Sequence, residues 1–455
     1  MRTLNPYSRV QLPDSSPFLL NCSPLNNLTI RLLCNIKIIE RGRNMNSGDI
    51  AFIIFCAIAV FFMTPGVSML YGGMVDKNNT VNVITSTFVC CGLGILLWFT
   101  FGYTLSFGPD LGGLGIIGNF DYAFFRGLSI SEAGPYSSSI PSALFALLQT
   151  MTAVITPAII VGSVVGRMKF KPMVIFIIAW MFLVFFPLIH MVWADGGLMV
   201  KLNVVDYGGG TAVHMSSGIS GLVACIMLGK RENLGKKAII PHNLPLYYIG
   251  GSIVYAGWFA FNGGTALGAN GTAIHAIINT ALSSSVGILT WLMIDAIVNK
   301  KVSLSGIMIG AIVGLVGITP GAGYVPFWSA PIIGFFVTII CYFSMTSIKT
   351  KFGYDDALDV FGCHGVGGLL GILFVGIFAD PSVNSALAMK GLFFGEYQLL
   401  INQILAIFIT IMISVIMTFV IMSLLRKITV IRASSQEEKQ GLDISEHGEA
   451  AYNNE

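Results

Sequence analysis

The chain has 455 residues, of which 55% are hydrophobic and only 10% are charged, and its mean hydropathy is +0.79. Soluble domains carry about 25% charged residues, so this composition excludes a cytosolic enzyme, a nucleic-acid-binding protein and a disordered chain. Fifty-two glycines suit the close packing of helices in lipid. The composition indicates a protein that crosses the membrane several times.

Eleven apolar runs are each long enough for one helical span, which needs about 20 residues. Strands of a membrane barrel would be about 10 residues long and would alternate in polarity, and these runs do neither. We therefore predict an all-α polytopic membrane protein with eleven transmembrane helices. Their approximate limits are 50–71, 81–106, 140–165, 173–193, 211–229, 246–269, 275–298, 303–319, 328–347, 359–378 and 400–425.

The net charge of +3 is distributed unevenly between the connections. Alternate connections carry 12 basic residues against 3, and the larger set comprises Lys77, Arg167, Lys169, Lys171, Lys230, Arg231, Lys236, Lys237, Lys300, Lys301, Lys349 and Lys351. Basic loops stay in the cytoplasm. This distribution predicts a multi-pass protein of the cell membrane with the start of its first helix outside and its C-terminal tail inside.

Three regions follow from this organisation. Residues 1–44 contain six basic residues although the topology places them outside, so we expect an extension that is not translated, with the true start at Met45; a disordered extension is the alternative. Residues 45–425 form the membrane domain, and 426–455 a cytoplasmic tail. The eight cysteines lack C-x-x-C spacing, and six fall in apolar runs, where they read as small core residues.

An internal repeat connects two halves of the chain. Asp206 precedes His214 by eight residues and Asp356 precedes His364 by eight, and each histidine is followed by glycines at the same two offsets. The histidines fall in the fifth and tenth runs. Five spans per unit is an odd number, so the units must be inverted across the membrane, with one final helix added. Inverted repeats with a site near the midplane are typical of transporters.

The repeat changes how the two histidines are interpreted. A single buried histidine is usually a hydrogen-bonded core residue, but two in matching frames are expected to meet near the membrane centre, facing a cavity. A metal site is disfavoured because two imidazoles need further ligands, and the neighbouring Cys363 is expected on another helix face. No metal and no cofactor are predicted.

Asp206 begins a D-Y-G-G-G-T run at the mouth of the fifth helix. Its carboxylate is placed to accept the free N–H groups of Gly208, Gly209, Gly210 and Thr211. Such bonds would keep the carboxylate ionised, and the same charge would favour a cation above it. A helix cap and a cation site are both compatible with this position.

Several motifs resemble those of the ammonium transporter (Amt/Rh) family, in its bacterial form, from about Asp49 to Tyr452. They are Asp206-Tyr-Gly-Gly-Gly-Thr-Ala-Val-His214, His190-Met-Val-Trp193, Pro241-His-Asn-Leu-Pro245, Gly257-Trp-Phe-Ala-Phe-Asn262 and Asp359-Val-Phe-Gly-Cys-His364. The resemblance implies a transporter that takes up ammonium or methylammonium for nitrogen supply, a homotrimer in the lipid bilayer, and no enzymatic activity.

The resemblance also implies roles for single residues. Trp193 and Thr265 match an outer recruitment site, with Asp206 beneath it, and Thr265 stands where a serine is usual. Phe261 matches a phenylalanine that gates the pore. Below it, His214 and His364 match the twin histidines that line the pore, and Asp356 matches an inner supporting aspartate. In the family, ammonium loses a proton at the constriction, and ammonia crosses with or without a separately moving proton.

The third helix departs from the family pattern F-Q-x-x-F. The segment here is Leu148-Gln149-Thr150-Met151-Thr152, so both phenylalanines are missing, at Leu148 and Thr152. Phe145, one turn before Leu148, is a candidate to compensate. One wall of the recruitment site therefore differs from the family pattern.

The tail segment 441–452 resembles that of bacterial family members, which contacts a PII-type signal protein. The leading interpretation of the chain is thus an ammonium transporter. An ammonium sensor that signals through its tail is the alternative, disfavoured because no output domain is appended. An intramembrane enzyme is disfavoured because no nucleophile lies in a known motif.

Overall fold

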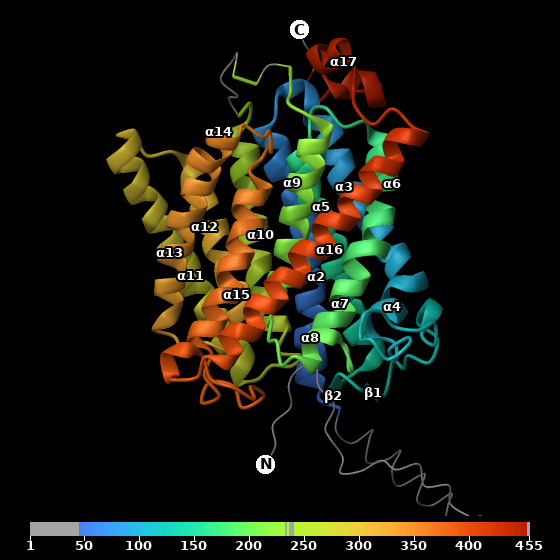
Figure 1. The fold of residues 1–455 in the computed structure, drawn as a ribbon, viewed down its shortest axis with the longest axis vertical. Helices are drawn as coiled ribbons and strands as arrows, with labels where there is room; N and C mark the ends of the chain where they lie inside the picture. Colours follow the sequence, from blue (N-terminus) through green and yellow to red (C-terminus); the bar gives the residue numbers. More distant parts are fainter. Residues whose placement is uncertain (1–44, 233, 236–240, 453–455) are drawn as a thin grey trace, which may run out of the picture.

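The computed structural model describes residues 45–232, 234–235 and 241–452. They form a bundle of long helices (Figure 1). The β1–β2 hairpin, α4 and α8 lie at one end of the bundle, which we call the hairpin end; α14 and α17 lie at the other, which we call the tail end. The extension 1–44 falls outside the described residues, and the proposed start, Met45, is the first residue that the structure describes.

The described elements are almost all helical. The α-helices are α2 (Ser47–Met74), α3 (Thr80–Leu97), α4 (Tyr103–Phe107), α5 (Ser142–Val164), α6 (Phe170–Trp180), α7 (Phe186–Trp193), α8 (Leu198–Lys201), α9 (Ser216–Leu228), α10 (Leu244–Gly264), α11 (Gly271–Ile294), α12 (Leu304–Ile318), α13 (Ser329–Phe343), α14 (Lys349–Phe352), α15 (Val366–Phe378), α16 (Gln398–Ile428) and α17 (Ser435–Gln440). The π-helical turns are η2 (Trp98–Gly102), η4 (Met181–Phe185), η5 (Gly210–Met215), η6 (Asp295–Asn299), η8 (Ser344–Ile348), η9 (Phe361–Gly365) and η11 (Asp443–His447). The 3₁₀ turns are η1 (Lys77–Asn79), η3 (Ala123–Phe125), η7 (Thr319–Gly321) and η10 (Leu392–Phe394). The antiparallel strands are β1 (Ala133–Gly134) and β2 (Ser137–Pro141).

Eleven helical segments of the described chain are long and apolar enough to cross a membrane, which confirms the predicted number. They are Ser47–Met74, Lys77–Phe107, Ser142–Val164, Phe170–Lys201, Gly210–Leu228, Leu244–Gly264, Gly271–Asn299, Leu304–Gly321, Ser329–Phe352, Phe361–Phe378 and Gln398–Ile428. Several extend beyond the predicted apolar runs, as Phe170–Lys201 does against 173–193 and Gln398–Ile428 against 400–425.

Helix α5 lies at the centre of the bundle, whereas α11 and α16 lie at its outside. In the most apolar 18-residue window of α5, 94% of residues are buried, against 33% for the spans that contain α11 and α16. The outer helices expose large apolar side chains, among them Ile274 and Phe408. Such surfaces are stable against lipid or another apolar face, but not against water.

Connections from the set rich in basic residues and from the alternate set lie at opposite ends of the bundle. Lys349 and Lys351 lie in α14 at the tail end, whereas Lys201 lies in α8 at the hairpin end (Figure 1). The alternation of basic connections along the chain therefore corresponds to two physical ends, as an odd number of spans between them requires.

The sequence repeat has a matching backbone. At the third residue after each aspartate the chain is left-handed, with φ +102° at Gly209 and +58° at Asp359. At the fifth residue the backbone N–H donates to the aspartate, from Thr211 to Asp206 Oδ2 and from Phe361 to Asp356 Oδ2, both at 2.7 Å. A π-helical turn then carries the histidine in both halves.

The two halves cross at glycines that allow close backbone approach. A Cβ atom on Gly218 would overlap the backbone of Gly365, and one on Gly368 would lie 2.8 Å from the Gly210 oxygen and 2.9 Å from His214 Cβ. Each glycine lies four residues after the histidine of its own half. The repeated glycines therefore bring the two histidine-bearing segments together.

A buried arginine holds the connections of both halves together at the tail end. Arg167 is fully buried and donates to the carbonyls of Gly229, at 2.8 Å, and of Asp355. Arg231 binds the Asp355 carboxylate through Nη2 at 2.6 Å. Burial alone would raise the pKa of Asp355, but the bonds from Arg231 and the charge of Arg167 hold it below its usual value. This cluster fixes the loop that leads directly to Asp356.

The C-terminal tail packs on the connections at the same end. Lys169 Nζ contacts Glu437 Oε1 at 2.6 Å and Glu446 Oε1 at 3.3 Å. Asp443 Oδ1 accepts the Asn82 N–H at 2.8 Å at the start of α3. The Tyr452 hydroxyl lies 3.0 Å from His242 Nε2. Residues 429–452 are therefore docked on the bundle.

Candidate functional site

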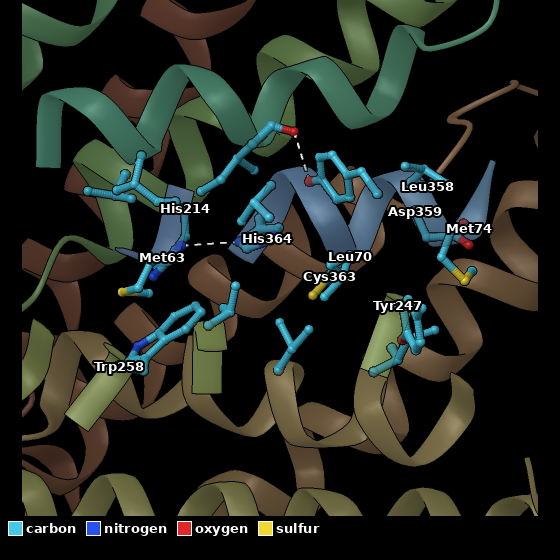
Figure 2. Close-up of a pocket in the computed structure, with 18 of the residues that line it drawn as sticks. Met63, Leu70, Met74, His214, Tyr247, Trp258, Leu358, Asp359, Cys363 and His364 are labelled. Atoms are coloured by element: carbon cyan, nitrogen blue, oxygen red, sulfur yellow. Dashed lines mark hydrogen bonds between the residues drawn. The ribbon is translucent and has the colours of Figure 1, made fainter. Parts of the chain in front are cut away.

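Two buried histidines from the two repeats meet in the middle of the bundle. His214 comes from η5 and His364 from η9, and their Nδ1 atoms lie 3.2 Å apart (Figure 2). The exposed fractions are 2% and 8%. The meeting of the two side chains, which their matching sequence frames predict, is observed. Whether each ring nitrogen donates or accepts depends on the tautomers of the pair.

A cavity of about 100 Å³ runs from these histidines toward the tail end of the bundle. Most of its wall is apolar, formed by side chains such as Met63, Leu70 and Met74 (Figure 2). Two tyrosines also line it, but Tyr71 donates its hydroxyl to the Ile159 carbonyl and Tyr247 donates to the Ser305 carbonyl. The two histidines are thus the polar groups at the centre of a passage whose walls are largely apolar.

Trp258 fixes the ring of His214. The two rings stack with centroids 5.3 Å apart and an interplanar angle of 20°. The indole Nε1 donates to Thr319 Oγ1 at 2.8 Å, and that hydroxyl donates to the Leu315 carbonyl. Trp258 lies in the motif Gly257–Asn262 but was assigned no role from the sequence.

Cys363 differs from expectation. It lines the same cavity as His364 instead of facing elsewhere (Figure 2), because the cavity extends along this segment from His364 as far as Asp359. Among the described residues, no group of three or more His, Cys, Asp or Glu side chains is arranged to hold a metal ion. The described cysteines are all free thiols.

Asp206 is buried and receives four hydrogen bonds. Oδ1 accepts the N–H groups of Gly209 and Gly210 at 2.9 and 2.7 Å, and Oδ2 accepts the N–H and hydroxyl of Thr211 at 2.7 and 2.5 Å. Gly208, expected among the donors, is not one of them. Burial raises the pKa of Asp206 above its ordinary value and outweighs these bonds, which lower it. The expectation that these bonds alone keep the carboxylate ionised therefore leaves out the larger, opposing effect of burial.

Asp356 occupies the equivalent place at the other end of the passage. It is fully buried, and Lys349 Nζ donates to its backbone carbonyl at 2.7 Å. The same ammonium group pairs with Asp359 Oδ1 at 2.7 Å, and Asp359 lines the cavity (Figure 2). Burial raises the pKa of Asp359 to about 6, against the opposing charge of Lys349. Asp359 begins the motif that ends at His364 but was assigned no role from the sequence.

A second, smaller cavity of about 20 Å³ lies on the other side of Phe261. Its lining consists of Val60, Leu148, Gln149, Thr152, Trp193, Gly208, Phe261 and Thr265. Phe261 lines both cavities and so stands between them. We call this second space the outer cavity.

Two of the predicted recruitment residues, Trp193 and Thr265, line the outer cavity, and Asp206 supports it. The indole Nε1 of Trp193 donates to the Asp206 carbonyl at 2.8 Å, which fixes the plane of the ring. The Thr265 hydroxyl donates to the Phe261 carbonyl at 2.9 Å, so its oxygen lone pairs stay available to a ligand. The structure therefore brings the three residues together around one small space.

Phe145 does not supply a ring to this wall. It is 2% exposed and packs in an aromatic cluster, stacked on Tyr136 with centroids 5.0 Å apart and near Phe107 at 5.0 Å. It is not among the residues that line the outer cavity. The α5 side of the cavity is formed instead by Leu148, Gln149 and Thr152.

Comparison with known proteins identifies the family. The sequence model of the Ammonium Transporter Family matches residues 51–452. An ammonium transporter of Bacillus subtilis is 43% identical over 408 residues, covering 90% of this chain and 99% of the relative. Ammonium transporter Amt1 of Archaeoglobus fulgidus is 38% identical, covering 90% of this chain and 100% of the relative.

Solved structures agree with the sequence relatives. Mep2 of Saccharomyces cerevisiae superposes with a TM-score of 0.80 at 32% identity, covering 86% of this chain and 91% of that one. A structure described as a Sensor Amt Protein also has a TM-score of 0.80, at 25% identity, covering 88% and 98% of the two chains. The sequence relatives named here are transporters rather than enzymes. From its sequence and its fold, this eleven-span chain belongs to the Ammonium Transporter Family.

Proposed function

We propose that the protein recruits NH4+ at the outer cavity, removes a proton, and conducts NH3 past His214 and His364 into the cytoplasm. The proton either returns to the water outside or crosses separately from NH3. The observation that carries this proposal is that two successive cavities share Phe261 as their common wall. The outer cavity offers an aromatic face and a hydroxyl oxygen, and the cavity that contains the histidines is apolar apart from a few polar groups. A cation suits the outer cavity, and a small neutral molecule suits the cavity that contains the histidines.

Capture of the cation is assigned to Trp193, Thr265 and Asp206. An indole face attracts a cation with about 0.5–2 kcal/mol, depending on how far both are desolvated. The Thr265 oxygen can accept one N–H bond of NH4+. Asp206, whose carbonyl holds the Trp193 ring, supplies a negative carboxylate beneath the site when it is ionised.

Selection against K+ follows from the apolar passage. K+ and NH4+ are similar in size, so a ring of carbonyl oxygens would separate them poorly. An apolar pore imposes a large dehydration cost on K+. NH4+ avoids this cost because it can release one proton and enter as NH3. Phe261 acts as the gate at the boundary. The histidines then donate and accept hydrogen bonds with the passing molecule, and Asp356 supports the inner end.

The direction of the pathway rests on charge. The tail end carries the basic connections, so we assign it to the cytoplasm and the hairpin end to the outside. The outer cavity then opens toward the exterior. On the same reasoning the protein resides in the cell membrane, with its C-terminus cytoplasmic, and supplies nitrogen as ammonium or methylammonium.

A transporter is favoured over a sensor. The likeness to a Sensor Amt Protein is matched by likeness to Mep2, and the named sequence relatives are transporters. The docked tail is a surface suited to a PII-type signal protein, and the exposed apolar side chains on outer helices are suited to a homotrimer.

The test is flux through the purified protein in proteoliposomes. An imposed ammonium gradient should produce uptake well above that of protein-free vesicles, and an equal potassium gradient should not. Absence of protein-dependent ammonium uptake would overturn the proposed function. Equal uptake of potassium would overturn the selectivity mechanism.

A further inference from the structure

The α5 wall of the outer cavity contains two polar side chains that have no hydrogen-bond partner in the described part of the chain. Gln149 and Thr152 are 4% and 8% exposed. Within the described residues, neither the Gln149 amide nor the Thr152 hydroxyl makes a hydrogen bond, and both side chains line the cavity. Buried polar groups are almost always hydrogen-bonded. Because both unpaired side chains line the outer cavity, we expect them to bind the molecule that enters it.

Neighbouring threonines on α5 show the usual arrangement. Thr150 donates its hydroxyl to the Ala146 carbonyl at 2.8 Å, and Thr156 donates to the Thr152 carbonyl at 2.6 Å. This bond to the preceding turn is the standard way in which a helical threonine satisfies its hydroxyl. Thr152 does not make it, so its hydroxyl remains available to the cavity.

The polar groups of the outer cavity come from two helices. The Thr265 hydroxyl is committed as a donor to Phe261, so its oxygen can only accept from a ligand. The Gln149 amide and the Thr152 hydroxyl come from α5, and both groups contain an oxygen that can accept. A volume of about 20 Å³ holds one water-sized occupant, which matches NH4+ with its single heavy atom and four N–H donors.

We infer that Thr152, assisted by Gln149, is a specificity-determining residue that accepts an N–H bond from ammonium on the side of the cavity formed by α5. This inference rests on the proposed function and names a further part of its recruitment site. The site then recognises its ligand by several N–H donors as well as by charge and the Trp193 face. Methylammonium has one N–H fewer, and its methyl group would face an oxygen that is left unpaired, which is a strong basis for discrimination.

The variant Thr152→Val tests this because valine keeps the shape of threonine and removes only the hydroxyl. The matched control is Thr150→Val, the same change on the same helix at a hydroxyl that bonds its own backbone. Thr152→Ser restores the oxygen. All three would be made in the full chain and reconstituted in proteoliposomes, with thermal unfolding in detergent to establish that each is folded.

Uptake of ammonium and of methylammonium would be measured across a range of concentrations. For Thr152→Val, we expect the half-saturating ammonium concentration to rise about tenfold, as for loss of one hydrogen bond to a charged ligand, while that of methylammonium rises less than about threefold. Thr152→Ser should restore the wild-type preference, and Thr150→Val should retain it. Should valine prevent folding, Thr152→Ala is expected to show the same change in preference.

The inference is overturned if Thr152→Val and Thr152→Ala keep the wild-type preference, or if both substrates weaken equally. That result is distinguishable from failure of the proposed function, in which the wild-type protein itself shows no ammonium uptake. A water molecule held by Thr152 and Gln149 as a purely structural element would give the equal-weakening or unchanged outcome.

Discussion

His214 and His364 face each other through the same ring atom, Nδ1, at 3.2 Å. A neutral imidazole carries one N–H, so a hydrogen bond between two Nδ1 atoms requires opposite tautomers. One ring then has a lone pair at Nε2 and the other has an N–H there. The pair therefore combines one acceptor and one donor at Nε2, and moving a proton through the pair exchanges those roles. Stacking of Trp258 on His214 limits how far the rings can turn away from this arrangement.

Replacing Trp193 tests the aromatic contribution to capture. Trp193→Leu removes the cation–π attraction and keeps an apolar side chain beside the outer cavity. We expect the half-saturating ammonium concentration to rise about tenfold, corresponding to about 1.4 kcal/mol, with a smaller fall in flux at saturating ammonium. Concentration-dependent uptake in proteoliposomes measures both. An unchanged half-saturating concentration would remove Trp193 from the recruitment site.

Asp206 is predicted to combine a cap with a charge, and two substitutions separate these roles. Asp206→Ala removes the acceptor of four hydrogen bonds, so it should reduce both folding and transport. In Asp206→Asn, the amide oxygen can still accept from Gly209 and Gly210, and the Thr211 hydroxyl can turn to accept from the amide N–H. Only the Thr211 N–H then loses its partner, at a cost of about 1–3 kcal/mol.

We therefore expect Asp206→Asn to fold, with a modest loss of thermal stability, and to transport poorly because the charge is gone. Expression, unfolding temperature and ammonium uptake must be measured on the same preparations. Folded Asp206→Asn protein with full uptake would show that the residue is only a helix cap, and the electrostatic part of the mechanism would be wrong.

The crossing of the two repeats predicts a strong effect of one methyl group. In Gly218→Ala, the new Cβ would overlap the backbone of Gly365, and relief requires the histidine-bearing segments to separate. We expect destabilisation of about 1–3 kcal/mol, seen as a lower unfolding temperature in detergent. Gly92→Ala in α3 is the matched control, because no atom of the described residues, apart from its own helix backbone, lies within 4 Å of the added Cβ. A wild-type unfolding temperature for Gly218→Ala would contradict the close crossing.

Docking of the tail is expected to depend on pH through Glu437. The hydrogen bond from Lys169 is the main cause that lowers the pKa of this carboxyl from 4.5 to about 2. A lowered pKa means that the contribution to docking is complete above about pH 4.5 and is lost as the pH falls toward 2. Because the pair is partly exposed, the contribution should stay within about 1 kcal/mol.

Glu437→Gln should loosen the tail at pH 7 by the same small amount, whereas Glu449→Gln, at an exposed glutamate, should not. The distance between a spin label on the tail and one on the α5–α6 connection reports both effects. We expect a small population with an undocked tail in Glu437→Gln at pH 7 and in the wild type near pH 3. Identical distance distributions in all samples would exclude a role of Glu437 in docking.

The long elements and the repeat were predictable because they depend on local patterns. A run of about 20 apolar residues determines a span regardless of its neighbours, and the D-x7-H frame placed His214 and His364 at equivalent positions. The sequence alone did not indicate the π-helical turns, because hydropathy carries no signal for one extra residue in a turn. The side chain of Cys363 was placed wrongly because the sequence does not indicate a cavity that extends from His364 to Asp359.

The rest of the candidate site depends on tertiary contacts. Missing phenylalanines were visible at Leu148 and Thr152, but only the fold shows that Phe145 packs elsewhere and that the hydroxyl of Thr152 lines a cavity. The support of Trp258 by Thr319 joins residues 61 positions apart. The Lys169–Glu437 pair joins residues 268 positions apart. Contacts between residues so far apart in the chain leave no local pattern from which they could be predicted.

Ammonium uptake by the double variant His214→Leu/His364→Leu tests most directly whether the substrate passes along the two histidines. The wild type and the variant would be compared in proteoliposomes at equal protein density, with thermal unfolding to show that both are folded. We expect the initial rate of ammonium uptake to fall at least about tenfold, equivalent to at least about 1.4 kcal/mol of added barrier. A folded double variant with the wild-type rate would contradict the account.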